Sequence, residues 1–191
     1  PAVSDQVLIV INSATSANAG MDQTVCGNMV TLAASPATGT WSGGAGTFSP
    51  NNTTATATYT ATPAEVGTTV VFTWTVPDPD GAGPCMGSTD MVSITFDPPA
   101  TVTAGPDQTI CGTTMVTLAG SVGGGATSGT WSGGTGTFNP DNMTLNAVYT
   151  FSPSEILAGS ATLTLTTNDP AGPCPAVNDQ ALLMVNSATT P

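Results

Sequence analysis

Short segments of this chain alternate hydrophobic and polar residues with a period of two. In Val70–Val76 the alternate positions carry valine, phenylalanine and tryptophan, and Leu163 and Leu165 occupy the matching positions of a later segment. Val92–Phe96 and Ala181–Val185 repeat the pattern. Because successive side chains of a strand point to opposite faces, each segment is predicted to be a strand with one buried face.

Glycine and proline separate further short segments of the same kind. No stretch is typical of an amphipathic helix of three turns or more. Parallel strands need long crossover connections, usually helices, so we expect antiparallel sheets. Six or seven short strands in each half of the chain predict an all-β fold of tandem immunoglobulin-like β-sandwiches. The additional strands are expected at Met29–Ala34, Gly39–Ser42, Gly46–Phe48 and Thr54–Thr60.

The two halves of the sequence are copies of each other. The segment GTWSGGAGTFSPNN at Gly39–Asn52 recurs as GTWSGGTGTFNPDN at Gly129–Asn142. Such self-similarity is typical of a repeat array. We assign residues 16–99 to repeat 1 and residues 100–191 to repeat 2. Repeat 2 carries an insertion at Ser121–Ser128, which is expected to be a surface loop.

Two segments outside the repeats are expected to connect modules. Residues 1–15 match residues 175–189, so they are predicted to be the closing strand of a preceding repeat, in the same long chain or in a head-to-tail copy. That assignment makes adjacent repeats the expected partners. The link Phe96–Thr101, with its two prolines, is expected to be a stiff extended joint.

The four cysteines are Cys26, Cys85, Cys111 and Cys174, and three pairings are open to them. The repeat favours Cys26–Cys85 and Cys111–Cys174, one disulfide per repeat. Their spacing fits no zinc motif. Disulfides indicate an oxidising compartment.

The charge balance excludes several classes of function. The chain has no lysine, arginine or histidine, and 12 acidic residues give a formal charge of −12. Binding to nucleic acid or to an anionic membrane surface needs cationic side chains. The lack of histidine and lysine removes most general bases and activated nucleophiles. Glu65 and Glu155 occupy equivalent positions in different repeats, so they are not expected to share a site. We expect a non-catalytic protein without a cofactor and without membrane insertion.

A few residues are candidates for binding. Asp78 and Asp80, in a DPDG turn, are calcium candidates, although they lack the length of an EF-hand loop. Trp41 and Trp131 are candidates for stacking on a sugar, and the alternative is a tryptophan in the core of an immunoglobulin-like sandwich. Tyr59 and Tyr149 are expected to be half-buried, with the hydroxyl bonded to the turn that follows. Asn52 and Asn142 stand in N-x-T sequons, which indicate exposed loops.

Apolar residues also fall on positions that the alternation assigns to solvent. The candidates for lateral contact between chains are Leu8, Val10, Val148, Leu182 and Met184, where repeat 1 has serine or threonine at the equivalent strand positions. An apolar surface of this kind suggests self-association.

The combined motifs, AGxDQTxCG, VTLA, GTWSGGxGTF, YT and GPC, resemble the immunoglobulin-like or PKD-like repeats of very large Bacteroidota cell-surface proteins of the gliding and adhesin type. The resemblance covers both repeats and the partial third. It implies type IX secretion, a cell-surface or filament location, and a stalk role without catalytic residues. We therefore expect the structural spacer of an extracellular repeat protein. The alternatives are a carbohydrate- or protein-binding module, or an accessory module of a secreted enzyme.

Overall fold

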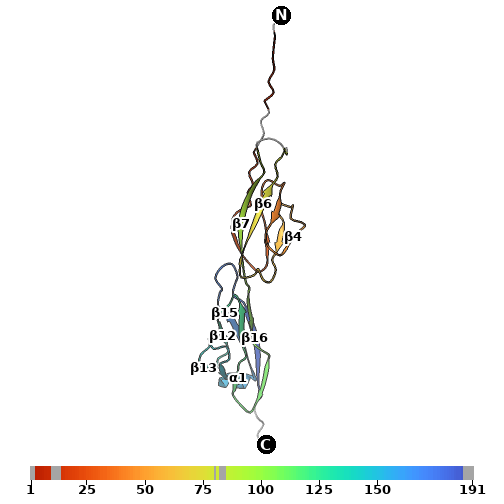
Figure 1. Cartoon of the computed structure of the whole chain (residues 1–191). Helices are drawn as coiled ribbons and strands as arrows, with labels where there is room; N and C mark the ends of the chain where they lie inside the picture. Colours follow the sequence, from red (N-terminus) through yellow and green to blue (C-terminus); the bar gives the residue numbers. More distant parts are fainter. Residues whose placement is uncertain (1–2, 10–13, 80, 82–84, 187–191) are drawn as a thin grey trace. The chain divides into compact units, whose positions relative to one another are not determined.

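The computed structural model describes residues 3–9, 14–79, 81 and 85–186. The chain divides into two compact units, Pro1–Phe96 and Asp97–Pro191, and each contains its own β-sandwich (Figure 1). The predicted all-β fold is confirmed.

Unit 1 consists of two sheets that face each other across a core. One sheet has the strand order β1-β7-β6-β3 and the other has the order β2-β5-β4. The strands are β1 (Gln23–Cys26), β2 (Met29–Thr31), β3 (Thr40–Ser42), β4 (Thr47–Ser49), β5 (Thr58–Thr60), β6 (Thr69–Val76) and β7 (Ser88–Asp97).

Unit 2 repeats this arrangement and adds a small sheet. Its two main sheets have the orders β12-β15-β16-β9 and β10-β14-β13, and β11 pairs with β8. The elements are β8 (Ala100–Thr103), β9 (Gln108–Cys111), β10 (Met115–Thr117), β11 (Ser121–Gly124), β12 (Gly129–Gly133), β13 (Thr137–Asn139), β14 (Val148–Thr150), α1 (Pro153–Ala158), β15 (Ser160–Thr167) and β16 (Asn178–Asn186).

The period-two pattern decides which side chains enter the cores. Phe72 and Trp74 on β6 are fully buried, and the register pairs Trp74 with Asp90 and with the buried Trp41. In unit 2, Leu163 and Leu165 on β15 occupy the matching positions, and Leu165 pairs with Trp131. The predicted inward faces of these strands are therefore confirmed.

A single turn of helix, α1, replaces in unit 2 the turn that follows β5 in unit 1. The hydroxyl of Ser152 accepts a hydrogen bond from the backbone of Glu155, whose side chain in turn accepts from the backbone N–H of Ser152. This capping box satisfies two donors at the helix start. Gly159 ends the helix in a left-handed conformation that suits glycine.

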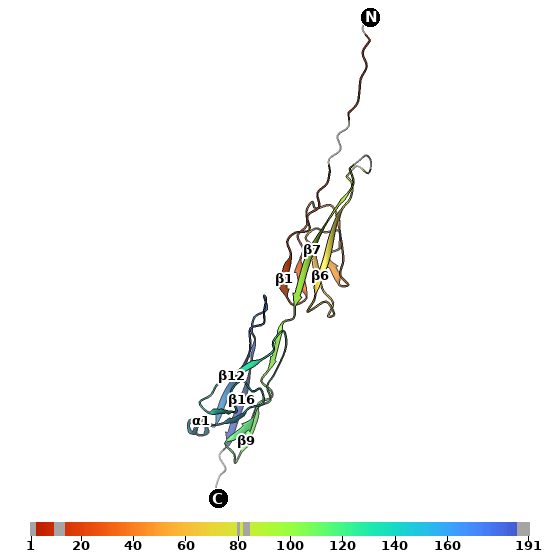
Figure 2. The same ribbon diagram turned by 60° about the vertical axis from the view of Figure 1, so that its left-hand side comes forward.

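The expectation that every sheet is purely antiparallel is wrong. In unit 2, β9 runs parallel to β16, from Leu183 opposite Gln108 to Asn186 opposite Cys111 (Figure 2). No crossover helix is needed, because β9 and β16 are the first and last strands of the main sheets and the rest of the module connects them.

Two segments that were expected to be irregular, the joint Phe96–Thr101 and the insertion Ser121–Ser128, form strands that pair with each other. β8 begins within the predicted joint Phe96–Thr101, and β11 begins the insertion Ser121–Ser128. The two strands are antiparallel, with Val102 opposite Val122. The backbone N–H of Gly125 also donates to the carbonyl oxygen of Pro99 at 3.1 Å. The insertion therefore forms part of a sheet rather than a free loop.

The predicted disulfides Cys26–Cys85 and Cys111–Cys174 are wrong. Among the described cysteines, Cys26 and Cys174 are disulfide-bonded. Cys111 carries a free thiol.

The direction of the first strand explains why pairing within a repeat fails. Cys111 lies opposite Asn186, at the end of β16, whereas Cys174 precedes the start of that strand. Nine residues of strand span about 26 Å, and a disulfide needs Cα atoms within about 7 Å. In unit 1, Ala19 N–H donates to Asp90 and Ser93 N–H donates to Asp22, so the chain toward Cys26 likewise runs away from Cys85.

Among residues 1–15, the described residues 3–9 form no strand, and the side chains of Val7, Leu8 and Ile9 are exposed. The assignment of residues 1–15 to the closing strand of a preceding repeat stays a prediction, as do the repeat boundaries at residues 16–99 and 100–191.

Replacement of the buried Trp131 by alanine is expected to lower the free energy of unfolding of unit 2 by about 3–5 kcal/mol, because the cavity loses the ring's contacts. The substitution also removes the indole N–H that donates to the carbonyl oxygen of Leu145 at 3.2 Å, so this oxygen loses its donor. Chemical denaturation followed by circular dichroism measures the change. The control Thr130→Ala, on the exposed face of the same strand, should change stability by less than about 0.5 kcal/mol. Equal losses in both variants would contradict the packing described here.

Candidate functional site

A buried tyrosine–glutamate pair stands in the core of unit 1. The hydroxyl of Tyr59, on β5, lies 2.9 Å and 3.0 Å from the two carboxylate oxygens of Glu65. The same hydroxyl accepts a hydrogen bond from the backbone N–H of Gly46 at 2.6 Å. Both side chains are buried. The pair therefore connects the turn after β5 to the loop between β3 and β4, two strands that belong to different sheets.

The carboxylate of Glu65 accepts three more hydrogen bonds. The backbone N–H of Ala45 donates to one oxygen at 2.7 Å, and the backbone N–H and hydroxyl of Thr62 donate to the other at 2.8 Å and 3.0 Å. Hydrogen bonds to a charged acceptor are among the stronger ones in proteins. We call this arrangement of Tyr59, Glu65 and the backbone of the β3–β4 loop the carboxylate latch.

Unit 2 contains a second carboxylate latch. The hydroxyl of Tyr149 donates to Glu155 at 2.7 Å and accepts from the backbone N–H of Gly136 at 2.8 Å. The carboxylate also accepts from the backbone N–H groups of Thr135 and Ser152, at 2.7 Å and 2.8 Å.

The GTWSGGxGTF segment supplies this loop because its glycines leave room for the tyrosine. A Cβ atom on Gly46 would stand 2.8 Å from the Tyr59 hydroxyl, closer than side chains approach each other. Gly44, at φ +68°, adopts a left-handed conformation that glycine tolerates at little cost. The glycines therefore allow the close approach of the loop backbone to the tyrosine.

The hydrogen bonds of the latch shift the pKa values of its groups. Burial alone would raise the pKa of Glu65 and of Glu155, but the donors around each carboxylate outweigh burial, so both values lie below 4.5. For Glu155 the tyrosine hydroxyl is the strongest of these donors. Burial and the neighbouring carboxylate raise the pKa of Tyr149 to about 12. At neutral pH each latch is therefore an ionised glutamate held by a neutral tyrosine.

The latch does not have the features of an acid–base site. General acid–base catalysis is most efficient near the operating pH, and the two pKa values lie well below and well above neutrality. The oxygens of each glutamate already accept hydrogen bonds from the loop and the turn of its own unit. The two glutamates lie in separate units, as expected, but the sequence analysis did not predict that each binds a tyrosine hydroxyl. The available signal was their shared spacing, since a tyrosine stands six residues before each of the only two glutamates in the sequence.

The candidate sugar-stacking residues lie inside the cores. Trp41 and Trp131 are 0 % exposed, and their indole N–H groups donate to backbone carbonyls of Ala55 and Leu145. Trp41 packs against Trp74 with ring centroids 5.0 Å apart. Sugar stacking needs an open ring face, so this interpretation is wrong for both residues.

The calcium candidates do not form a described site. Asp78 is half-buried, and Asp80 lies outside the described residues. Within the part of the chain that the structure describes, no group of three carboxylate, cysteine or histidine side chains could hold a metal ion.

Other aspartates have roles inside their own units. In each repeat the aspartate of the DQT motif accepts a hydrogen bond at 2.8 Å from the backbone of the closing strand: Asp22 from Ser93, and Asp107 from Leu182. The sequon asparagines, Asn52 and Asn142, each donate from Nδ2 to the carbonyl oxygen of the core tryptophan. These polar motifs fix strands and loops in place.

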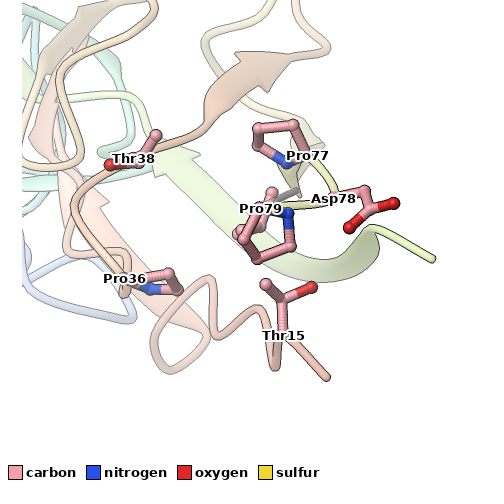
Figure 3. A pocket seen from close by; sticks show the side chains of 7 residues that line it. Thr15, Pro36, Thr38, Pro77, Asp78 and Pro79 are labelled. Atoms are coloured by element: carbon pink, nitrogen blue, oxygen red, sulfur yellow. The ribbon is translucent and has the colours of Figure 1, made fainter. Parts of the chain in front are cut away.

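A pocket of about 420 Å³ lies at the end of unit 1 beyond β6. The rings of Pro77 and Pro79 stand close together at its border, and Pro36 and Thr15 lie across from them (Figure 3). The hydroxyl of Thr15 is buried and has no hydrogen-bond partner. Three prolines, a valine and two threonines line the pocket together with a single carboxylate, that of Asp78, so it lacks the several convergent charged or amide groups of a specific small-molecule site.

The candidates for lateral contact are distributed unevenly. On β16, Leu182 and Met184 are 37 % and 40 % exposed, opposite Thr162 and Ser160 of β15. Val148 on β14 is half-buried, Leu8 is exposed, and Val10 lies outside the described residues. Lateral contact through these residues stays a prediction.

Comparison with solved structures identifies the fold. The insect immune protein hemolin superposes with a TM-score of 0.54 and 14 % identity over 88 % of this chain and 46 % of hemolin. Sidekick-1 immunoglobulin domains 1–5 superpose with a TM-score of 0.45 and 14 % identity, over 91 % of this chain and 40 % of that chain. Drosophila N-cadherin EC1–4 superposes with a TM-score of 0.48 and 10 % identity, over 91 % of this chain and 50 % of that chain. No protein-family model and no curated protein matches the sequence. The predicted immunoglobulin-like fold is thus confirmed, and this chain spans less than half the length of hemolin.

Acid is expected to weaken the latches. Because the folded pKa of Glu155 lies below the unfolded value, its contribution to stability is present above about pH 4.5 and is lost as the pH falls through the folded pKa. The melting temperature should stay nearly constant from pH 7 to 5 and fall below that range. Glu155→Gln should destabilise unit 2 by about 1–3 kcal/mol at pH 7, since the amide cannot accept every hydrogen bond.

The pH series of the Gln variant checks the cause. Its melting temperature should depend less on pH between 5 and 3 than that of the parent, whereas the exposed control Asp169→Asn tests a carboxylate outside the latch. An unchanged pH dependence in Glu155→Gln would contradict the assignment.

Proposed function

We propose that this chain is a non-catalytic structural module of an extracellular repeat protein, the shaft or spacer of a surface adhesin or filament. One observation carries the proposal. The polar motifs shared by the two repeats have partners within their own unit: the tyrosine–glutamate pair, the sequon asparagine and the DQT aspartate. The repetition therefore preserves a scaffold rather than a shared surface site.

The disulfide supports an extracellular location. Cys26 and Cys174 are disulfide-bonded, and such bonds persist in oxidising compartments. In the described residues no helix is long and apolar enough to cross a membrane. The resemblance to Bacteroidota surface repeats extends the proposal to type IX secretion, gliding or adhesion, and stalk-like display.

The second candidate function is adhesion through the sheet face itself. Hemolin, whose structure was described in connection with homophilic adhesion, has the same fold. Leu182 and Met184 give β16 an apolar outer face that a second chain would cover. This candidate predicts self-association, whereas a spacer needs none.

A spacer needs neither a ligand nor a second chain, and this provides the test. The 191-residue chain should bind no immobilised glycan, and its sedimentation coefficient should stay that of a monomer as its concentration is raised.

The matched control is the double variant Leu182→Ser/Met184→Ser, which should sediment like the parent, because a spacer does not use this apolar face. Binding of the chain to immobilised glycans, or a monomer–dimer equilibrium that the double variant abolishes, would contradict the spacer function and favour the binding alternatives.

A further inference from the structure

Unit 1 begins a strand pair that unit 2 completes. In unit 2, β8 and β11 form four residue pairs, the first of which joins Thr103 to Ser121. In the described part of unit 1 only the equivalent of this first pair is formed, where Asn18 and Ser35 exchange two backbone hydrogen bonds of 2.8 Å. The two pairs are equivalent because Asn18 and Thr103 each precede the AGxDQT motif, and both serines follow VTLA by one residue.

The chain of unit 1 turns away before it forms the next pair. The carbonyl oxygen of Pro36 accepts a hydrogen bond from the indole N–H of Trp74 at 3.2 Å, which holds the loop before β3 in place. In unit 2 the next hydrogen-bonded pair is Thr101 with Gly123, and the equivalent of Thr101 is Ser16. Within the described residues the backbone of Ser16 has no hydrogen-bond partner, and this residue is exposed. Its strand edge is therefore open.

The open backbone groups of Ser16 face the side on which the partner strand lies in unit 2. Bonding groups alternate between the two sides of a strand. The N–H of Ala17 donates to the hydroxyl of Ser88, on β7, at 2.8 Å, whereas the N–H of Asn18 donates to Ser35 on the other side. The N–H of Ser16 therefore points in the same direction as that of Asn18.

The pocket beyond β6 corresponds to the space that the insertion Ser121–Ser128 fills in unit 2. Thr15 and Pro77 are two of its walls (Figure 3). At the position of Thr15, unit 2 has Ala100, which pairs with β11. At the position of Pro77, unit 2 has Asn168, which accepts two hydrogen bonds of 2.9 Å from backbone N–H groups of the insertion. Unit 1 has a pocket of about 420 Å³ where unit 2 has an extended segment.

We propose that residues 14–18 and this pocket bind an extended peptide segment of a different protein by β-strand addition. The segment pairs with Ser16 and continues the antiparallel ladder that Asn18 and Ser35 begin. An open strand edge is a template for such pairing. The site goes beyond the spacer function, because it allows a spacer to hold a second protein.

The internal comparison and the charge indicate the chemistry of the segment. The insertion that fills this space in unit 2 has glycine at positions 123–125, so small residues suit the site. Asp78 lines the pocket and the chain carries a formal charge of −12, so a cationic side chain suits it as well. This chain has no lysine, arginine or histidine, and the segment therefore belongs to another protein.

The test is an NMR titration of the isotope-labelled 191-residue chain with the acetylated and amidated peptide GGGATK. This peptide has the sequence of Gly123–Thr127 followed by lysine. The amide shifts should saturate and be confined to residues 14–18 and the pocket. Ser16→Pro, which removes the N–H of the open edge, should weaken binding about tenfold or more, whereas Ser16→Ala should bind like the parent.

Two further peptides test the chemistry without altering the protein. PGGATK lacks the N–H that faces Ser16 and should bind about tenfold more weakly than GGGATK. GGGATE should also bind more weakly, and the difference should shrink as salt is added. The absence of saturable shifts at millimolar peptide, or equal affinities for the three peptides, would overturn the proposal. Self-association of the chain that GGGATK displaces would overturn it too, because the occupant would then be a second copy.

Discussion

A negative charge can be buried only where hydrogen-bond donors replace water, and this chain has no cationic side chain to help. Glu65 and Glu155 are buried and ionised because backbone N–H groups, hydroxyls and a tyrosine surround them. The consequences reach beyond each carboxylate. The loop that joins the two sheets must bring its backbone to the tyrosine, so its glycines are required, and the turn after the tyrosine must present its own N–H groups. The latch thereby ties this loop to the turn after β5.

The cores show how one scaffold accepts different side chains. In unit 1 the ring centroids of Phe96, on the closing strand, and Tyr59 lie 6.1 Å apart. In unit 2 Val185 stands at the position of Phe96, and the ring comes from Phe151 instead, with its centroid 5.5 Å from that of Tyr149. An aromatic ring therefore packs beside the tyrosine in both units, although it comes from the closing strand in unit 1 and from the residue after β14 in unit 2. Cores tolerate such exchanges when the total volume is kept.

The sequence predicts those features that depend on local periodicity. Alternation along Val70–Val76 identifies the buried face of β6, and the repeat identifies two similar modules. It does not predict the partner of the first strand, because alternation says which face is buried and not which strand lies beside it. Local alternation therefore does not predict that β9 lies parallel to β16. For the same reason it does not predict that Cys111 lies too far from Cys174 to form a disulfide. The sequence likewise does not decide whether Trp41 and Trp131 stack on a sugar or fill the core, because that depends on their burial. The latch depends on contacts between segments that no local pattern connects.

The pairing of first and last strands has a consequence for biosynthesis. β9 finds its neighbour only when β16, some 70 residues later in the chain, has emerged. Until then a nascent module exposes an unpaired edge, and the closing strand of any neighbouring repeat has a closely related sequence. Because synthesis of the chain is vectorial, the closing strand of a module appears before that of any later repeat, which favours pairing within the module. With two closely related repeats in one chain, the order in which the strands emerge thus limits the exchange of strands between them.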